Sequence, residues 1–162
     1  MTNSLVTGAG HRLGRAMALY LASRGHDVAV HYATSEDAAL KVVAEIKAMG
    51  RNAIAVQADL LIEDDAHSLV VRAAEQLGGP ILCLVNNAST FEHDTISSAS
   101  RDTWDHNMGS NLRAPFILTQ AMAAQDLPES LDGEGEPIAV GLIVNMVDQR
   151  VRKLTPDFMT YT

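Results

Sequence analysis

The sequence predicts an α/β fold in which a doubly wound parallel sheet lies between two layers of helices. Strand-like apolar segments alternate along the chain with amphipathic helical segments of about 12 to 15 residues. Residues 27–32 form a continuous apolar run, which is typical of a strand covered on both faces. A glycine-rich turn joins the first strand to the first helix. We therefore expect right-handed βαβ units within one domain over residues 1–162.

The first strand and helix are joined by residues 7–14, Thr-Gly-Ala-Gly-His-Arg-Leu-Gly. Ser4–Val6 predicts a short apolar strand before this turn. The apolar positions of the following helix are Leu13, Ala16, Met17, Tyr20 and Leu21, and Gly25 is expected to end it. Such a turn offers backbone N–H groups and the positive end of a helix dipole to a phosphate, with a plain β–α turn as the alternative.

The second strand, 27–32, leads to a second helix that ends at Gly50. Ser35 is expected to cap this helix, and Glu36 and Asp37 lie in its first turn, where the dipole favours negative charge. Its expected buried face consists of Leu40, Val43 and Ile46.

A third strand is expected at 53–57 and a third helix at 63–77. The inward positions of that helix are Ala66, Leu69, Val70 and Ala73, and Gly78 and Gly79 end it. A fourth strand follows at 81–85.

A long helical stretch is predicted at 101–125. Pro115 lies inside it and has no N–H to donate to the carbonyl of Asn111, so we expect a kink or a widened turn at 111–115. An acidic, solvated loop at 126–137 precedes a fifth strand at 140–146.

Composition and charge exclude several classes of protein. The 162 residues are 47% hydrophobic, with a net charge of −8 and an isoelectric point near 5.1, which argues against a nucleic-acid or anionic-membrane surface. Cys83 is the single cysteine, so neither a disulfide framework nor a cysteine metal site is expected. His11, His26, His67, His93 and His106 lack the spacing of metal ligands. With no signal peptide and no apolar run of about 18 residues, we expect a cytoplasmic location and no membrane span.

Special or polar residues follow each of the five expected strands. They are Gly8 to Gly14, His31 to Ser35, Asp59, Asn87 to Phe91, and Asp148. Ligands of doubly wound sheets bind at the carboxyl ends of the strands, so this edge is the expected site.

The ordered motifs resemble those of the short-chain dehydrogenase/reductase family over the whole chain. They are Thr7-Gly8-x-x-x-Arg12-x-Gly14, Asp59-Leu60, Asn86-Asn87-Ala88-Ser89, Asn111 and Tyr161. Two departures are Arg12, where the family usually has glycine, and Asp148, where it usually has serine. Together with Ser89 and Phe91, they resemble the pteridine reductases, which reduce pterins and folates with NADPH.

The resemblance implies a Rossmann fold and a set of cofactor-binding residues. These are Gly8, His11, Arg12, Leu13, Gly14, His31, Tyr32, Thr34, Ser35, Asp59, Leu60, Asn87, Ala88 and Ser89. No carboxylate stands at the end of the second strand to accept from a ribose 2′-OH, which favours NADP(H). His31, Thr34 and Ser35 are the expected 2′-phosphate ligands, although Thr34 replaces an arginine frequent in pteridine reductases. Asp59 is expected to accept from the adenine amino group, with turn capping as its alternative.

The substrate residues implied by the resemblance are Arg12, Ser89, Phe91, Asp148 and Tyr161. A substrate that accepts hydride at carbon needs a proton at nitrogen, which a carboxyl group beside a phenol can deliver or relay. Asp148 and Tyr161 are the expected catalytic pair, with a turn cap and a half-buried surface tyrosine as alternatives.

The remaining substrate residues keep structural alternatives. Phe91 is expected to stack on a flat heterocycle, or else to pack in the core. Arg12 is expected to donate to the cofactor or to a pterin carbonyl, or else to be a solvated arginine at a helix start. The carbonyl of Asn111 is expected to hold a water of the family's proton relay.

In the family a lysine follows the tyrosine by four residues, which would be position 165. The sequence ends at Thr162, so we expect a piece of a longer enzyme that lacks its C-terminal part and is not itself catalytically competent. The resemblance also implies a homotetramer, assembled through the long helix that contains Asn111 and through a helix after Tyr161.

Three functions remain open at this point. The first is an NADPH-dependent reductase of a pterin or dihydrofolate. The second is a family member that acts on a carbonyl or alcohol substrate. The third is a protein that binds NADP without catalysing a reaction.

Overall fold

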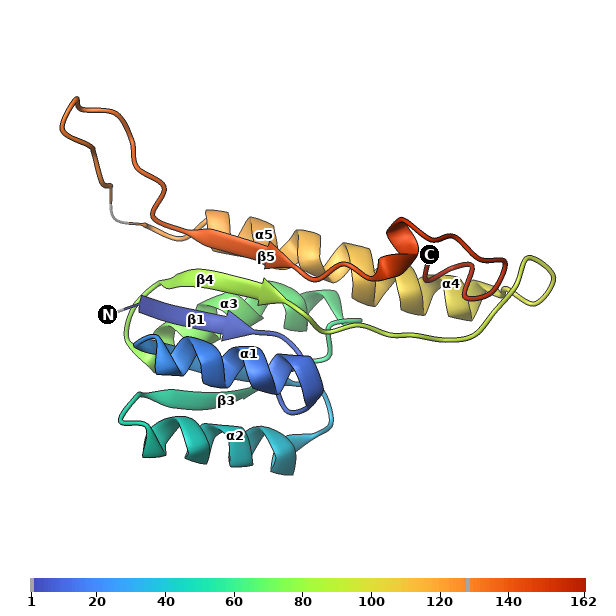
Figure 1. Ribbon diagram of the computed structural model, residues 1–162, viewed down its shortest axis with the longest axis horizontal. Coiled ribbons are helices and arrows are strands. Elements are labelled where there is room, and N and C mark those ends of the chain that lie inside the picture. The colour runs from blue at the N-terminus through green and yellow to red at the C-terminus, as the bar shows by residue number, and fades with distance from the viewer. Residues whose placement is uncertain (1, 128) are drawn as a thin grey trace.

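A computed structural model describes residues 2–127 and 129–162 of the chain. Five parallel strands form one sheet in the order β3-β2-β1-β4-β5 (Figure 1). The strands are β1 Thr2–Val6, β2 His26–Tyr32, β3 Ala53–Gln57, β4 Ile81–Asn86 and β5 Leu142–Asn145. The predicted doubly wound α/β fold is therefore confirmed.

Helices cover both faces of the sheet. They are α1 Arg12–Ser23, α2 Glu36–Ala48, α3 Glu63–Leu77, α4 Arg101–Met108 and α5 Ala114–Ala123. A π-helical turn, Gly109–Arg113, joins α4 to α5, and a 3-10 turn, Gln149–Val151, follows β5.

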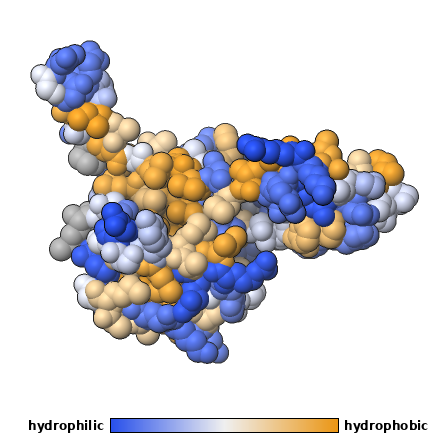
Figure 2. All heavy atoms as spheres, viewed as in Figure 1, coloured by the Kyte–Doolittle hydropathy of each residue, from blue (hydrophilic) through white to orange (hydrophobic). Residues whose placement is uncertain are grey.

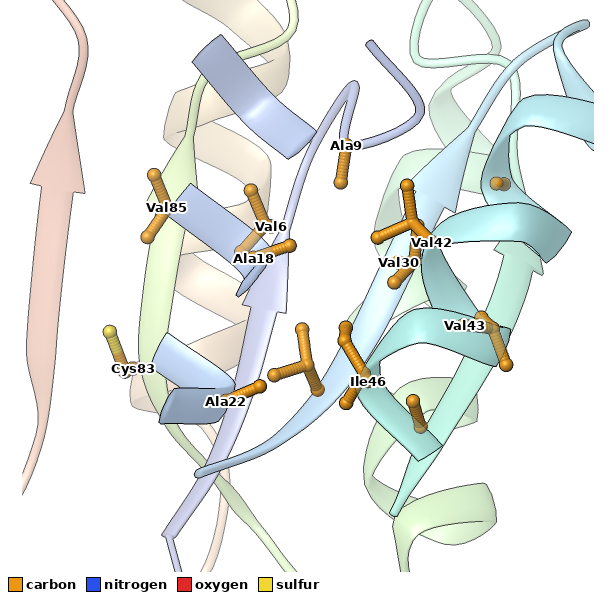
Figure 3. Packing of buried hydrophobic residues seen from close by; sticks show 13 residues of the cluster. Val6, Ala9, Ala18, Ala22, Val30, Val42, Val43, Ile46, Cys83 and Val85 are labelled. Atoms are coloured by element: carbon orange, nitrogen blue, oxygen red, sulfur yellow. The ribbon is translucent and has the colours of Figure 1, made fainter. Parts of the chain in front are cut away.

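Two hydrophobic clusters hold these three layers together. Neighbouring strand residues point to opposite faces, so Val6 faces α1 and α2 while Leu5 faces α3 and α5. Figure 3 shows the first cluster, in which Ala18 of α1 lies beside Val6 and Ala22 lies one turn farther along the helix. Most core side chains are fully buried and apolar, which is the main source of stability for such a sheet.

The predicted apolar face of α1 is confirmed at Met17 and Leu21, which pack partly buried against the core, and is wrong at Leu13, Ala16 and Tyr20. Leu13 and Tyr20 are 63% and 64% exposed, and the buried positions are Gly14, Ala18 and Ala22. These small residues recur every fourth position, so the helix backbone approaches the sheet closely, while Leu13 and Tyr20 turn outward.

The predicted face of α2 is wrong at one position. Leu40 is 49% exposed, whereas Val43 and Ile46 are buried together with Ala39 and Val42. Ser35 precedes the helix as expected, but within the described residues its side chain makes no capping hydrogen bond.

Helix α3 has the predicted bounds and the predicted buried face. Ala66, Leu69, Val70 and Ala73 are all fully buried, and Gly78 ends the helix in the left-handed conformation with φ 77°.

The acidic loop before β5 projects from the body of the molecule (Figure 1), with Pro128 outside the described residues. Leu131 and Pro137 pair across it, and its tip is hydrophilic (Figure 2). The following strand is shorter than the predicted 140–146. Over the described residues, no helix combines the length and the apolar character that a membrane crossing requires.

Candidate active site

The glycine-rich turn after β1 folds tightly against the loop after β4. Gly8 has φ 62°, and a Cβ built on Gly14 would lie 2.3 Å from the carbonyl oxygen of Gly8 and 2.6 Å from Nδ2 of Asn87. A side chain at position 14 would therefore push the turn away from α1.

His31 at the end of β2 braces this turn. Its Nδ1 accepts from the Gly8 N–H at 3.0 Å, and its Nε2 lies 3.1 Å from the carbonyl oxygen of Ala58. The ring is 1% exposed, and burial lowers the pKa of His31 to about 4. A neutral ring that accepts at Nδ1 and donates at Nε2 satisfies both bonds.

The expectation that the His31 side chain binds a 2′-phosphate is therefore corrected. Both of its ring nitrogens are used inside the protein, and the ring lies under the turn rather than at the surface. The carbonyl of His31 also serves the turn, because it accepts from the Ala9 N–H at 2.9 Å.

Thr7 and Asn87 join the loops after β1 and β4. The Thr7 hydroxyl oxygen accepts from the N–H groups of Asn87 and Ala88, both at 2.9 Å. Nδ2 of Asn87 donates to the carbonyl oxygen of Thr7 at 2.8 Å. The Asn87 side chain thus holds the loops after β1 and β4 together, with its amide directed into the protein.

An open cleft of about 760 Å³ lies between the glycine-rich turn, the end of β2 and the faces of α1 and α2. It brings together His11, Thr34 and Ser35, three of the predicted cofactor residues. Their hydroxyl groups, the imidazole and the nearby backbone N–H groups suit a phosphate, so the cleft fits the ribose phosphate end of NADP. Tyr32, also predicted, is half-buried at the end of β2.

Two cations in this cleft were missed by sequence reasoning. Arg15 lies one turn into α1 and pairs with Glu45 of α2 at 2.6 Å, and Lys41 of α2 also lines the cleft. The spacing of both residues is typical of ordinary helix surface charges. Only the packing of α1 against α2 brings them to one site.

Asp59 makes a local turn contact. Its Oδ1 accepts from the Leu61 N–H at 3.0 Å, which is the predicted alternative of turn capping. The neighbouring Leu60 packs on the core beneath α3.

Arg12, with φ 47°, holds a left-handed conformation that costs about 1 to 3 kcal/mol for a residue with a side chain. Leu13 is exposed beside it.

A second group of side chains gathers near the ends of β4 and β5. Phe91 stacks on Phe158 with ring centroids 4.1 Å apart and meets Tyr161 edge-on at 4.8 Å. The guanidinium of Arg150 lies 4.5 Å from the ring centroid of Phe158. Sequence reasoning found Phe91 and Tyr161. It missed Phe158 and Arg150, whose places depend on how residues 146–162 fold back.

Tyr161 is half-buried beside the carboxylate of Asp148. Burial first, and then the charge of Asp148 and a hydrogen bond to it, raise the pKa of the Tyr161 phenol, while Arg150 opposes this rise. Asp148 is exposed rather than enclosed, and its Oδ1 also accepts from the Arg150 N–H at 2.9 Å, which is the predicted turn cap. Ser89 is exposed near the start of the loop after β4.

The predicted widened turn in the long helix is confirmed, two residues earlier than expected, as the π-helical turn at 109–113. The Ala114 N–H donates to the carbonyl oxygen of Gly109, five residues back. The side chain of Asn111 then reaches Thr90, accepting from its N–H at 2.9 Å and donating to its carbonyl oxygen at 3.0 Å. This pairing was not predicted, because it joins residues from distant segments.

No group of three or more His, Cys, Asp or Glu side chains within 2–127 and 129–162 is arranged to hold a metal ion. The structure has an open cleft lined by hydroxyl groups and an imidazole at one end, and a phenol, a carboxylate and an aromatic ring at the other. Both lie along the carboxyl edge of the sheet, where doubly wound folds bind their ligands.

Comparison with known proteins gives a consistent family assignment. Residues 2–161 match the short chain dehydrogenase family. A 3-oxoacyl-[acyl-carrier-protein] reductase, FabG, of Staphylococcus epidermidis is 37% identical over 125 residues, which are 77% of this chain and 51% of the relative. An L-rhamnose 1-dehydrogenase (NAD(P)(+)) of Sphingomonas sp. is 36% identical over 143 residues, 88% of this chain and 55% of that protein.

Among solved structures, FolM alternative dihydrofolate reductase 1 from Brucella suis in complex with NADP is similar over 99% of this chain and 62% of its own. The TM-score is 0.86 and the sequence identity 41%. Further similar structures also hold NADP or NADPH. The chain spans about half the length of the curated relatives that it matches.

Proposed function

Because the chain belongs to the short-chain dehydrogenase family of oxidoreductases, we propose that it is part of an NADPH-dependent reductase of pterins or dihydrofolates. One observation carries this proposal. Tyr161 lies beside the carboxylate of Asp148 and meets the ring of Phe91 edge-on, so a proton donor, a carboxylate and a flat aromatic face converge on one place.

The residues of the cleft suit NADP(H) as the cofactor. Thr34 and Ser35 would hold the 2′-phosphate with His11. Arg15 and Lys41 would attract its charge, against three carboxylates that line the same cleft, Glu36, Asp37 and Glu45. Gly8 and Gly14 keep the turn open to the pyrophosphate, since neither position admits a side chain. The bound cofactor supplies the hydride.

Tyr161 is proposed to give the proton that the substrate nitrogen takes up. The phenol is protonated at neutral pH, as an acid requires, and the raised pKa of Tyr161 makes it a weak acid until the bound substrate and cofactor change its surroundings. Asp148 is exposed and therefore in contact with water, so it is placed to replace the proton on Tyr161 after each turnover. Phe91 would orient a planar ring by aromatic contact beside Phe158, with which it stacks.

Arg12 and Ser89 would hold the polar edge of the substrate. Both are exposed, and they follow β1 and β4 at the carboxyl edge of the sheet. A planar guanidinium with several donors matches the carbonyl and ring nitrogens of a pterin. Arg12 keeps its strained left-handed backbone, which is common where a residue is held for binding. For the complete enzyme, we expect the substrate to be a small molecule that is present in the cytoplasm.

A second candidate function is the reduction of a simple carbonyl substrate. It is favoured by the identity of 37% to a 3-oxoacyl reductase, whose named activity is of this kind. Such a substrate takes its proton at oxygen, for which Tyr161 alone suffices. The two candidates therefore differ in whether Asp148 and Phe91 are needed.

The test is NADPH oxidation at 340 nm by the complete gene product. Dihydrobiopterin and dihydrofolate would be compared with a panel of ketones and with an acetoacetyl thioester, each with NADPH and with NADH. We expect turnover of the pterins and preference for NADPH. Turnover of only the ketones or the thioester would instead establish the carbonyl reductase.

A further inference from the structure

A buried carboxylate holds the residue that precedes Tyr161. Asp94, in the loop between β4 and α4, is 1% exposed. Its Oδ1 accepts from the Thr160 N–H at 3.1 Å, and its Oδ2 accepts from the Thr160 hydroxyl at 2.6 Å. The carbonyl oxygen of Asp94 accepts from the Met159 N–H at 3.4 Å. One aspartate thus fixes both the backbone and the side chain next to the proposed proton donor.

The same threonine is held from its other side by α4. Nδ2 of Asn107, which is also 1% exposed, donates to the hydroxyl oxygen of Thr160 at 2.7 Å and to the carbonyl oxygen of Thr103 at 3.0 Å. The Thr160 hydroxyl therefore accepts from Asn107 and donates to Asp94, so its orientation is fully determined.

This network continues to the loop that carries Ser89 and Phe91. Oδ1 of Asn107 accepts from the Thr90 hydroxyl at 3.2 Å, and the backbone of Thr90 is paired with the Asn111 side chain. The segment with Tyr161 and the loop with Phe91 are thereby tied to one frame, formed by α4 and the π-helical turn. Figure 1 shows the C-terminal segment lying along α4.

The charge of Asp94 is held by neutral donors. Hydrogen bonds from Thr160, and in smaller part from Met159 and Thr103, lower the pKa of Asp94 although burial opposes them. No salt bridge reaches this carboxylate from the described residues. A buried carboxylate that is satisfied by hydrogen bonds to one short segment serves to fix that segment in place.

We propose that Asp94 is the positioning residue for Tyr161, acting through Thr160, with Asn107 as the second point of attachment. This inference rests on the proposed function, because it takes Tyr161 as the proton donor. Asp94 does not touch the reacting atoms. It sets the direction from which the phenol approaches the substrate, and a displacement of about 1 Å at such a group can lower turnover about 100-fold.

The experiment compares four variants of the complete gene product. Asp94→Asn keeps the shape of the side chain but replaces one acceptor with a donor, and Thr160→Val removes the hydroxyl at nearly constant volume. Thr160→Ser keeps the hydroxyl. Asp102→Asn is the matched control, since Asp102 is exposed in the first turn of α4.

We expect kcat to fall at least 10-fold in Asp94→Asn and in Thr160→Val. The KM for NADPH should stay within about 2-fold of wild type, since no residue of this network lines the cleft proposed for the 2′-phosphate. Thr160→Ser and Asp102→Asn should keep most of the wild-type kcat. A purely structural role would instead lower the melting temperature and the amount of folded enzyme while leaving kcat per folded molecule unchanged, and that result overturns the proposal.

Tyr161→Phe separates this inference from the proposed function. If Tyr161→Phe abolishes turnover while Asp94→Asn and Thr160→Val retain it, the positioning role is wrong and the proton donor stands. If Tyr161→Phe retains turnover, Tyr161 is not the proton donor and the positioning role is wrong with it, while pterin turnover by the wild type still decides the proposed function. If Asp94→Asn does not fold, the positioning role is tested by the kcat of Thr160→Val relative to that of Thr160→Ser, and equal values would show that it is wrong.

Discussion

His31 sets the shape of the glycine-rich turn through its two ring nitrogens. The ring is neutral because it is buried, and this neutrality lets Nδ1 accept from the Gly8 N–H. Protonation at Nδ1 would remove that acceptor and place an uncompensated charge under the turn. The protonation state of His31 is therefore expected to affect both the stability of the protein and the binding of a phosphate by the turn.

We predict that His31 makes stability depend on pH between about 4 and 6.5. The folded pKa is about 4 and the unfolded value is 6.5, so the unfolded chain takes up a proton in this window while the folded chain does not. Stability should fall by about 3 kcal/mol as the pH falls across the window. Urea unfolding of wild type and His31→Gln from pH 4 to pH 7.5 measures this difference.

The control for this experiment is His67→Gln, at a half-exposed position of α3. The variant His31→Gln should lose stability less steeply with falling pH than both wild type and this control. Equal slopes in all three proteins would show that His31 does not carry the pH dependence.

Gly14 gives a steric prediction. In Gly14→Ala the new methyl group would lie 2.3 Å from the carbonyl oxygen of Gly8, so the turn must move. We expect a loss of about 1 to 3 kcal/mol in unfolding free energy and at least a 10-fold weaker binding of NADPH. Urea unfolding and NADPH fluorescence titration measure the two effects.

Gly133→Ala is the matched control, because no atom lies within 4 Å of a Cβ built there. It should leave both quantities close to wild type. NADPH binding by Gly14→Ala at wild-type strength would contradict a turn that approaches the cofactor closely.

Individual residues also show what sequence reasoning can and cannot reach. The strand ends pointed to Thr34, Ser35 and Phe91, because the carboxyl edge of a parallel sheet is known once the strands are known. Tyr161 follows no predicted strand and was expected only from the family motifs. The roles of His31 and Asp94 depend on contacts with segments more than twenty residues away. No local pattern marks such contacts.

At the scale of elements, the π-helical break between α4 and α5 is the feature that bears most directly on the proposed site. A π-helical turn adds one residue to a helical turn, which rotates the following side chains, and Pro115 lies just after it without an N–H to donate. The Asn111 side chain is thereby paired with both backbone groups of Thr90. One irregular turn thus fixes the loop that carries Phe91.

We predict that Asn111→Ala loosens this loop. Two hydrogen bonds are lost and the polar backbone of Thr90 loses its partner, which should lower the unfolding free energy by about 1 to 3 kcal/mol and reduce turnover. Thermal unfolding and NADPH oxidation measure the two effects. Gln120→Ala, at an exposed position of α5, is the control and should change neither. An Asn111→Ala enzyme with normal stability and turnover would show that the pairing is dispensable.

The elements differed in how well they could be predicted. The face of α3 was evident because larger apolar residues recur at helical spacing with polar residues between them. The buried face of α1 was predicted only in part, because the fully buried positions are Gly14, Ala18 and Ala22. Such small residues are only weakly hydrophobic, so a search for large apolar side chains at helical spacing passes over them. Two larger side chains of α1, Leu13 and Tyr20, lie on the opposite, exposed surface.

At the scale of the whole molecule, exposed apolar side chains mark two surfaces. One is the region of β5, where Leu142 of the strand and Ile138 before it are 58% and 48% exposed. Figure 2 shows hydrophobic surface over this part of the molecule. The other is a groove of about 640 Å³ along α4, the π-helical turn and α5. Leu112 and Phe116 in this groove are 61% and 52% exposed, more than an isolated helix surface normally shows.

We predict that the complete protein is an oligomer assembled through the α4–α5 groove. Phe116→Glu places a charge in a face that would otherwise be buried between subunits, so the assembly should dissociate to a smaller species. Sedimentation velocity of wild type and variant measures the mass. Tyr20→Glu, an equivalent change on the exposed side of α1, should leave the assembly intact. An unchanged mass for Phe116→Glu would place the interface elsewhere.

The overall architecture was the most predictable property of the chain. Alternating strands and helices predict a parallel sheet, and all five observed strands overlap the predicted ranges. The site was predictable only in outline, because the folding back of residues 146–162 onto α4 brings Phe158 and Arg150 to Phe91. Hydrogen bonds of Thr160 with Asp94 and Asn107 join that fold-back to distant segments, and no local pattern predicts them.

The central claim is that Asp148 and Tyr161 together deliver a proton to a pterin. The most direct test is the effect of Asp148→Ala on kcat/KM for dihydrobiopterin with NADPH, measured in the complete enzyme beside the Asp102→Ala control. We predict a loss of at least 100-fold for Asp148→Ala and less than 3-fold for the control. Pterin reduction at the wild-type rate by Asp148→Ala would contradict the claim and leave Tyr161 to act without its carboxylate partner.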